Sequence, residues 1–160
     1  MGMEFVVCPV GEKEHKAAIA EAILGALPDW FGIEAATREY VQQSQYLNFW
    51  AAYTAERAVG FISLRHHTSY AFEIFCMGVL PDFHRHGIGR SLLLACENYC
   101  QESGAEFLTV KTLDASNPDA SYAKTRQFYK AMGFRPLEVF PTLWGPANPC
   151  LYMIKSLSHA

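Results

Sequence analysis

A strand, a glycine-containing loop and the start of a helix follow one another directly between residues 79 and 93. The loop contains Gly87 and Gly89, and residues without a Cβ let the backbone approach a ligand closely and adopt a positive φ. The first N–H groups of a helix have no partner within it and favour an anion. The segment therefore predicts a phosphate-binding turn. The alternative is a tight strand-to-helix turn that needs both glycines for its shape alone.

Positive charge and a hydroxyl group surround this turn, on His84, Arg85, His86, Arg90 and Ser91. Two widespread phosphate loops do not fit the segment. A P-loop requires Gly-Lys-Ser/Thr, which is missing, and Gly87-Ile88-Gly89 lacks the third glycine of a dinucleotide-binding fingerprint. The segment is therefore predicted to bind phosphate as neither a P-loop nor a dinucleotide-binding fingerprint.

Apolar periodicity and turn residues predict the element order β-α-α-β-β-β-α-β-α-β-β. The expected strands are 4–7, 48–54, 58–64, 70–79, 106–113, 137–140 and 150–155, and the expected helices are 12–27, 35–43, 90–103 and 121–132. Three strands in succession before residue 79 predict an antiparallel meander. A helical crossover then makes strand 106–113 parallel to strand 70–79. With no linker or repeat, we expect a single domain over residues 1–160.

Composition excludes several partners. Charged residues make up 18% of the 160-residue chain, its net charge is −3, and no basic run suits a nucleic acid. No apolar run approaches the ~20 residues of a membrane span, and the start lacks a signal peptide, so we expect a soluble cytoplasmic protein without a membrane partner. Histidines and cysteines lack ligand spacing, which predicts no metal and reduced, mostly buried thiols: Cys8, Cys76, Cys96, Cys100 and Cys150.

Two segments resemble the GNAT superfamily of N-acetyltransferases. The family's central motif, Arg/Gln-x-x-Gly-x-Gly/Ala between a strand and a helix, corresponds to residues 84–89, and a second family segment matches residues 128–134, Phe-Tyr-Lys-Ala-Met-Gly-Phe. The motifs and the element order together cover about residues 48–155. The chain departs from the family at His84, where Arg or Gln is usual, and at Tyr122 and Thr125, where the family often has Asn and Ala. Backbone donors would then carry more of the phosphate binding.

The resemblance implies an α+β fold of αβα layers, with a mixed, mostly antiparallel sheet of about seven strands that is splayed between the fourth and fifth strands. It also implies acetyl-CoA as co-substrate. The pantetheine arm would lie along the fourth strand, and the diphosphate would lie on the glycine turn, residues 84–91. The residues implied to bind the cofactor are Met77, Gly78, Val79, His84, Arg85, His86, Gly87, Ile88, Gly89, Arg90, Ser91, Tyr122 and Phe128.

Acetyl transfer to an amine needs a base for the amine and an acid for the leaving thiolate. Glu73 is the candidate base, because it is ionisable within an apolar strand that should raise its pKa, and it resembles the strand glutamate of some histone acetyltransferases. The alternative is a solvent-facing strand residue. The resemblance implies that Tyr129 is the acid, and the alternative is a packing tyrosine. Cys76 or Cys150 as an acyl-accepting nucleophile is disfavoured, since nothing places a His base beside either.

The acceptor side is less defined. The resemblance would place Trp30, Phe31 and Glu34 on one wall of an acceptor pocket, where aromatic faces and a carboxylate suit a cationic amine, and Trp144 on the opposite wall. Equally, Trp30 and Phe31 can anchor the connection between two helices. The hypothesis is acetyl transfer to a small-molecule or peptide amine in a ternary complex, and a homodimer is compatible with it. The alternatives are a non-catalytic acyl-CoA-binding sensor or interaction module of the same fold, and an unrelated phosphate-binding protein.

Overall fold

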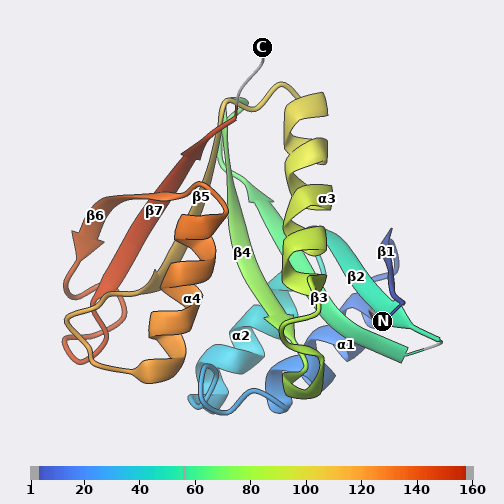
Figure 1. Cartoon of the computed structure of the whole chain (residues 1–160), viewed down its shortest axis with the longest axis horizontal. Coiled ribbons are helices and arrows are strands. Elements are labelled where there is room, and N and C mark those ends of the chain that lie inside the picture. Colours follow the sequence, from blue (N-terminus) through green and yellow to red (C-terminus); the bar gives the residue numbers. More distant parts are fainter. Residues whose placement is uncertain (1–3, 56, 158–160) are drawn as a thin grey trace. The chain divides into compact units, whose positions relative to one another are not determined.

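The computed structural model describes residues 4–55 and 57–157, and its helices and strands follow the predicted order (Figure 1). The helices are α1 (Lys13–Gly25), α2 (Glu34–Ser44), α3 (Ile88–Glu102) and α4 (Ala120–Ala131), with a short 3-10 turn, η1, at Pro81–Phe83. The strands are β1 (Val6–Pro9), β2 (Asn48–Thr54), β3 (Arg57–His66), β4 (Ala71–Val79), β5 (Phe107–Leu113), β6 (Arg135–Phe140) and β7 (Cys150–Ser156).

The first strand is displaced from its predicted position. It was expected over 4–7 with Pro9 as the residue that ends it, but β1 includes Pro9, which pairs with Trp50 of β2. Proline lacks the N–H that a ladder requires, so it is tolerated only at edges and ends of strands. Because β1 is the outermost strand in the order β1-β2-β3-β4-β5-β7-β6, Pro9 satisfies that rule.

The expected fold class is confirmed: the chain has a mixed sheet of seven strands with flanking helices. It divides into two compact units. The first unit comprises the described residues up to Arg65 together with Ile74–Tyr99, and the second comprises His66–Glu73 together with the described residues from Cys100 onward. The sequence offered no sign of this division, because both β4 and α3 contain residues of each unit.

Of the predicted meander over 48–54, 58–64 and 70–79, the first unit contains the antiparallel pair of β2 and β3, with the later residues of β4 beside β3. The outer strand β1 also pairs antiparallel with β2. Small residues bring helices close to the strands of this unit. A Cβ built on Gly78 would lie 3.0 Å from Leu27 and 3.1 Å from Ile23 of α1, and one on Gly60 would lie 3.1 Å from Leu92 of α3. Larger side chains at these two positions would therefore push α1 or α3 away from the strands that carry the glycine turn.

The second unit is built on β5, which pairs antiparallel with β7, and β7 pairs antiparallel with β6. The start of β4 runs parallel to β5, as predicted: Phe107 donates its N–H to the carbonyl of Tyr70, and further along Thr109 donates its hydroxyl to the carbonyl of Phe72. Only residues 71–73 of β4 group with β5. The division therefore falls where the family resemblance implies that the fourth and fifth strands diverge.

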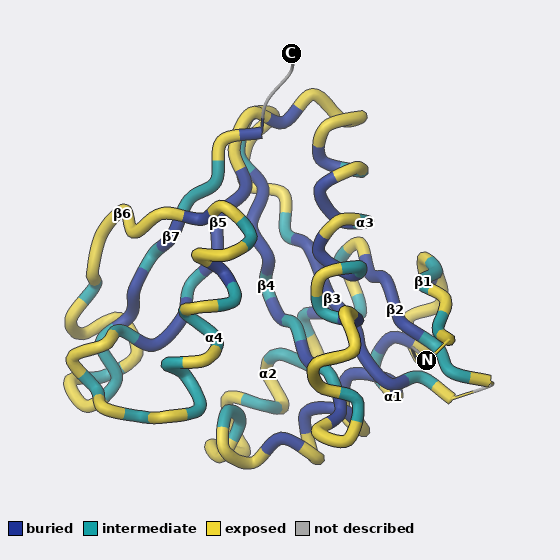
Figure 2. The backbone as a smooth tube through the Cα atoms, in the orientation of Figure 1, coloured by how far each residue is buried: buried dark blue, intermediate teal, exposed yellow. Residues whose placement is uncertain are grey.

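Burial is uneven along the strands. Figure 2 shows β3 and much of β4 buried, whereas β6 is exposed along most of its length. Among the described residues, the largest fully buried side chains are Phe49, Phe61, Phe134, Ile23, Leu24, Ile62, Leu64, Ile88, Leu92, Leu93, Leu108 and Met153. Four of the five cysteines are also buried. None of the helices in the described ranges has the length and apolar character that a membrane crossing requires.

Candidate active site

The glycine turn of the first unit joins β4 to α3 through η1. Two residues of this turn have left-handed backbone, Arg85 at φ +66° and Gly87 at φ +79°. The N–H of Ser91 donates to the carbonyl of Gly87 at 3.0 Å, which starts the hydrogen bonding of α3. The N–H groups of residues 88–90 precede that bond, and donors at such positions lie at the positive end of the helix dipole.

The environment of Gly87 suits an anion. A Cβ added to this residue would meet no heavy atom within 4 Å, so the space beside its backbone is open, and the residue is exposed. Gly89 lies within the first turn of α3 and has helical backbone. Of the two glycines, Gly87 thus supplies the left-handed conformation. An exposed, open turn at the N-terminus of a fifteen-residue helix has the donor arrangement that binds phosphate groups.

The side chain of His84 links the turn to the end of β4. Its Nε2 lies 2.7 Å from the carbonyl oxygen of Val79, and since a carbonyl only accepts, Nε2 carries the hydrogen and donates it. The edge of the ring contacts Trp30, with 5.8 Å between ring centroids. The side chain therefore spans the turn between strand and helix. His84 is exposed, as are the other basic side chains of the turn, Arg85, His86 and Arg90.

The fourth strand offers one partly open face. Met77 and Val79 are half-buried, whereas Gly78 between them is buried against α1. On the same side of the strand, Phe75 lies 4.1 Å from the guanidinium carbon of Arg65, measured to the ring centroid. Phe75 also contacts the ring of Tyr40 of α2 at 5.3 Å. Sequence reasoning missed this pair, although Phe75 shares the alternation of Met77 and Val79 and could have been found from it.

The predicted acceptor residues of the first unit are engaged with other aromatic rings. Phe31 contacts Tyr40 edge-on at 5.8 Å, and Trp30 contacts His84. Both are half-buried, which is the geometry that the anchoring alternative predicts. Glu34 is the first residue of α2 and is exposed. The structure thus brings Trp30 to the glycine turn and joins Phe31 to Phe75 through Tyr40.

In the second unit, Glu73 is buried, with 3% of its surface exposed, yet its surroundings are not apolar. One carboxylate oxygen, Oε1, lies 2.6 Å from Nε2 of His67, and the other, Oε2, lies 2.7 Å from Nζ of Lys111. The premise of an apolar environment was therefore wrong. Neither partner was predicted. A lysine inside the apolar strand 107–113 is a signal of a buried counter-charge that sequence alone could have supplied.

Glu73, His67 and Lys111 form the Glu73 cluster. Its surroundings bear on the alternative in which Cys76 or Cys150 accepts the acyl group. Nζ of Lys111 lies 5.3 Å from the ring centroid of Tyr152, on the neighbouring strand β7. Burial raises the pKa of the Cys150 thiol to about 11, although the Lys111 charge lowers it in part. Burial raises the pKa of Cys76 still further. Because the thiolate is the nucleophilic form, both residues are poor acyl acceptors near neutral pH.

Tyr129 lies on α4 and is held by aromatic neighbours. It is buried, with 6% of its surface exposed, and its ring contacts Phe128 at 5.4 Å and Phe134 at 5.5 Å between centroids. The N–H of Phe134 also donates to the carbonyl of Tyr129 at 2.9 Å, after the turn at Gly133. These contacts fix the ring, which suits either of its two predicted roles.

The start of α4 is fixed by acidic side chains. Asp119 caps the helix by accepting the N–H of Tyr122, a half-buried residue, at 3.0 Å. Asp114 accepts both the hydroxyl and the N–H of Ser116, and these hydrogen bonds lower the pKa of Asp114. The amide of Asn117 donates to the carbonyl of Ala147, which joins this loop to the loop that carries Trp144. Trp144 itself is 37% exposed.

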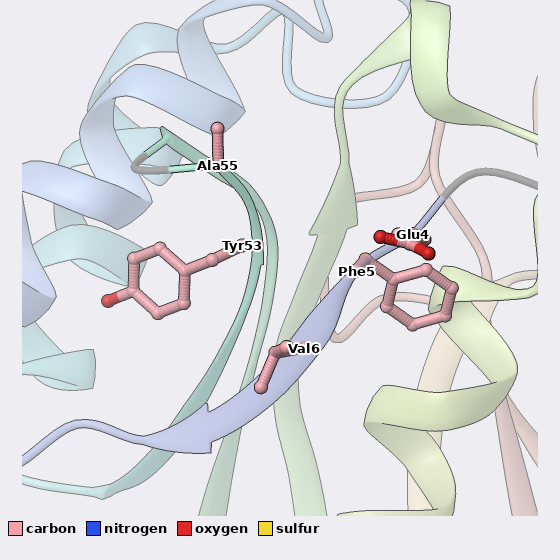
Figure 3. Close-up of a pocket in the computed structure, with 5 residues that line it drawn as sticks. All are labelled: Glu4, Phe5, Val6, Tyr53 and Ala55. Carbon is pink, nitrogen blue, oxygen red and sulfur yellow. The ribbon is translucent and has the colours of Figure 1, made fainter.

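A separate open pocket lies at the β1 edge of the first unit (Figure 3). It is lined by Glu4, Phe5, Val6, Tyr53 and Ala55, none of which was predicted to belong to a site. Burial, with a smaller contribution from Cys8, raises the pKa of Tyr53. The lining offers no phosphate-binding turn, so we do not assign the active site to it.

Comparison with protein families decides the classification of the chain. Residues 45–136, more than half of it, match the model of the acetyltransferase (GNAT) domain. The chain belongs to the GNAT acetyltransferase family. The matched segment contains the glycine turn, the start of β4 with Glu73, and Tyr129. Membership of this family indicates N-acetyltransferase activity and confirms the resemblance of the two motifs.

Solved structures share the fold at low sequence identity. A protein assigned to the GNAT acetyltransferase family from Desulfovibrio desulfuricans has a TM-score of 0.81 at 16% identity, over 97% of this chain and 100% of that one. An aminoglycoside 6'-N-acetyltransferase complexed with coenzyme A has 0.73 at 16%, over 97% and 98%. The Escherichia coli ribosomal-protein-S18-alanine N-acetyltransferase has 0.74 at 18%, over 97% and 96%. Among curated proteins, none matches the sequence significantly.

Proposed function

We propose that this GNAT protein transfers the acetyl group of acetyl-CoA to a primary amine, by direct attack of the amine within a ternary complex. The observation that carries the proposal is the exposed turn at the start of α3, where Gly87 is left-handed and faces open space. Acetyl-CoA supplies the acetyl group, whose carbonyl carbon gains the amine nitrogen and loses the thiolate. A solved relative of the same fold is complexed with coenzyme A, which supports this choice of co-substrate.

The residues proposed to hold coenzyme A lie mainly on main-chain donors. The turn would bind the diphosphate, with backbone N–H groups as the principal donors because His84 already donates to Val79. The main chain of β4 would bind the pantetheine arm as an added strand. The proposed set is Met77, Gly78, Val79, His84, Arg85, His86, Gly87, Ile88, Gly89, Arg90, Ser91, Tyr122 and Phe128.

Two groups of the second unit are proposed as the acid and the base of the acetyl transfer. Tyr129, fixed by Phe128 and Phe134, donates its phenolic proton to the leaving thiolate. The cluster around Glu73 receives the proton that the acceptor ammonium must lose before it attacks. A buried carboxylate that accepts hydrogen bonds from a lysine and a histidine is a candidate for such a role, because ionisable groups that are buried together are frequent in functional sites.

The acceptor is proposed to be a small-molecule or peptide amine. Relatives of the same fold act on aminoglycosides and on the alanine of a ribosomal protein, which supports both classes. Trp30, Phe31, Glu34 and Trp144 remain the proposed contacts to the acceptor. We further propose that both units form one acetyltransferase domain, because β4 and α3 each contribute residues to both.

A free-thiol release assay with acetyl-CoA, run against a panel of amines and peptides, tests this function. We expect release with at least one acceptor class, and we expect Tyr129→Phe to lower turnover about 100-fold with acetyl-CoA binding almost unchanged, since general acid catalysis typically contributes that much. Phe134→Leu removes the other ring that contacts Tyr129 and is the control for packing. Binding of acetyl-CoA without turnover on any acceptor would favour the sensor alternative, and no thermal stabilisation by acetyl-CoA would contradict the proposal.

A further inference from the structure

The three side chains of the Glu73 cluster in the second unit differ in how far they are exposed to solvent. Glu73 has 4% of its side chain exposed, whereas Lys111 has 28% and His67 has 41%. The Glu73 carboxylate is therefore shielded from solvent, and its two partners are the exposed members of the cluster. His67 lies in the turn before β4 and Lys111 in β5, so the three side chains converge from separate segments.

Hydrogen-bond chemistry fixes which atom of this cluster is able to accept a proton. The Lys111 ammonium at 2.7 Å from Oε2 stabilises the carboxylate form of Glu73. A carboxylate only accepts, so Nε2 of His67, 2.6 Å from Oε1, must carry the hydrogen between them. In the neutral ring the other nitrogen, Nδ1, then holds the lone pair. The Glu73 side chain is only 4% exposed whereas the His67 side chain is 41% exposed, so His67 is the basic group that an acceptor amine can reach.

We propose that His67 is the general base of the acetyl transfer and that Glu73 is its positioning residue. The inference rests on the proposed function. The acceptor ammonium gives one proton to Nδ1 of His67, the ring becomes an imidazolium, and the Glu73 carboxylate stabilises its charge, which is the logic of a base oriented by a buried acid. The nitrogen loses a second proton as the amide forms, and that proton restores the Tyr129 phenol that protonated the thiolate. The transfer as a whole therefore releases one proton, which the imidazolium passes to water, so that the neutral ring is restored.

The other groups near the cluster are consistent with this assignment. Among the described residues, the charged and titratable side chains that interact with it include Lys111 on β5, and Tyr152 and Cys150 on β7. The Lys111 ammonium is paired with the Glu73 carboxylate, and burial raises the pKa of Cys150 to about 11. Neither group therefore competes for the proton near neutral pH. The adjacent His66 stacks on Phe72, with ring centroids 4.0 Å apart.

The first test is the pH dependence of kcat/KM, with an acceptor that the thiol-release panel identifies. We expect His67→Gln to lower kcat/KM about 100-fold at pH 7 and to remove the fall in rate toward acid pH. Glu73→Gln should keep that fall but move it to lower pH, because the imidazolium loses its counter-charge. His66→Gln is the matched control and should stay within about twofold, the effect expected of a substitution outside the machinery.

Chemical rescue and a cofactor-free measurement complete the design. Added imidazole should restore part of the activity of His67→Ala, since the ring it replaces is exposed. Without any cofactor, an NMR titration of the His67 ring should move to lower pH in Glu73→Gln. If Glu73→Gln removes the acid fall while His67→Gln keeps it, Glu73 itself is the base and the inference is overturned. Absence of acetyl-CoA binding by the wild-type protein would instead overturn the proposed function.

Discussion

The glycine turn of the first unit and the Glu73 cluster of the second represent opposite ways of building a functional site. The turn is exposed, its donors are main-chain N–H groups, and its side-chain hydrogen bond is local, from His84 to Val79. The cluster consists of side chains around a buried carboxylate, and Lys111 reaches Glu73 across 38 positions of the sequence. A backbone site depends on conformation, and a side-chain site depends on charge balance. Different substitutions should therefore damage each of them.

The largest expected effect is on the turn. Gly87→Val should weaken acetyl-CoA binding about 100-fold, because displaced main-chain N–H groups lose hydrogen bonds to the charged diphosphate, which are worth about 1.5–3 kcal/mol each. A β-branched residue at φ +79° is strained, and its side chain occupies the open space beside the backbone. Isothermal titration calorimetry with acetyl-CoA measures the affinity.

Gly104 provides a matched control for this substitution. It has φ +82°, nothing lies within 4 Å of an added Cβ, and it follows the opposite end of α3. Gly104→Val should cost similar stability, of the order of 1–2 kcal/mol for a left-handed backbone, and leave the affinity for acetyl-CoA intact. Equal loss of affinity in both variants would show that the strain acts on the whole fold and not on the turn.

An intermediate effect is expected in the cluster. Lys111→Met removes the ammonium beside the buried Glu73 carboxylate and leaves it only the hydrogen bond to His67, so it should lower the free energy of unfolding at pH 7 by about 1–3 kcal/mol. Glu73→Gln in the same chain should recover most of this loss, because no unpaired charge then remains. Urea denaturation measures both, with the exposed Lys124→Met as the control for losing a surface charge. Simple additivity of the two substitutions would argue that the pair is not coupled.

The same contrast explains what the sequence could and could not predict. The turn was predictable because its determinants are local: Gly87, the adjacent strand and the helix start all lie within fifteen residues. The element order was predictable for a similar reason, from apolar periodicity within each segment. Lys111 and His67 were missed because the predicted pairing of 106–113 with 70–79 carries no register. The lysine in an apolar strand signals a buried counter-charge, but the sequence does not show that this counter-charge is Glu73. The division within β4 was missed because a single apolar strand gives no signal of where its neighbours change.

The smallest expected effect concerns the loop before α4, which combines both modes of construction. Hydrogen bonds from the hydroxyl and N–H of Ser116 lower the pKa of Asp114 from its usual 3.8, so the carboxylate adds stability above that value and loses it as the pH falls through the lowered one. Since the group is largely solvent-screened, Asp114→Asn should cost only about 0.2–1 kcal/mol at pH 7. Thermal melts from pH 7 down to pH 2 should show the wild-type advantage shrinking in acid. Ser116→Ala should reproduce part of the loss, and an advantage that persists unchanged at pH 2 would mean that the loop is held by Asn117 and its contact to Ala147 instead.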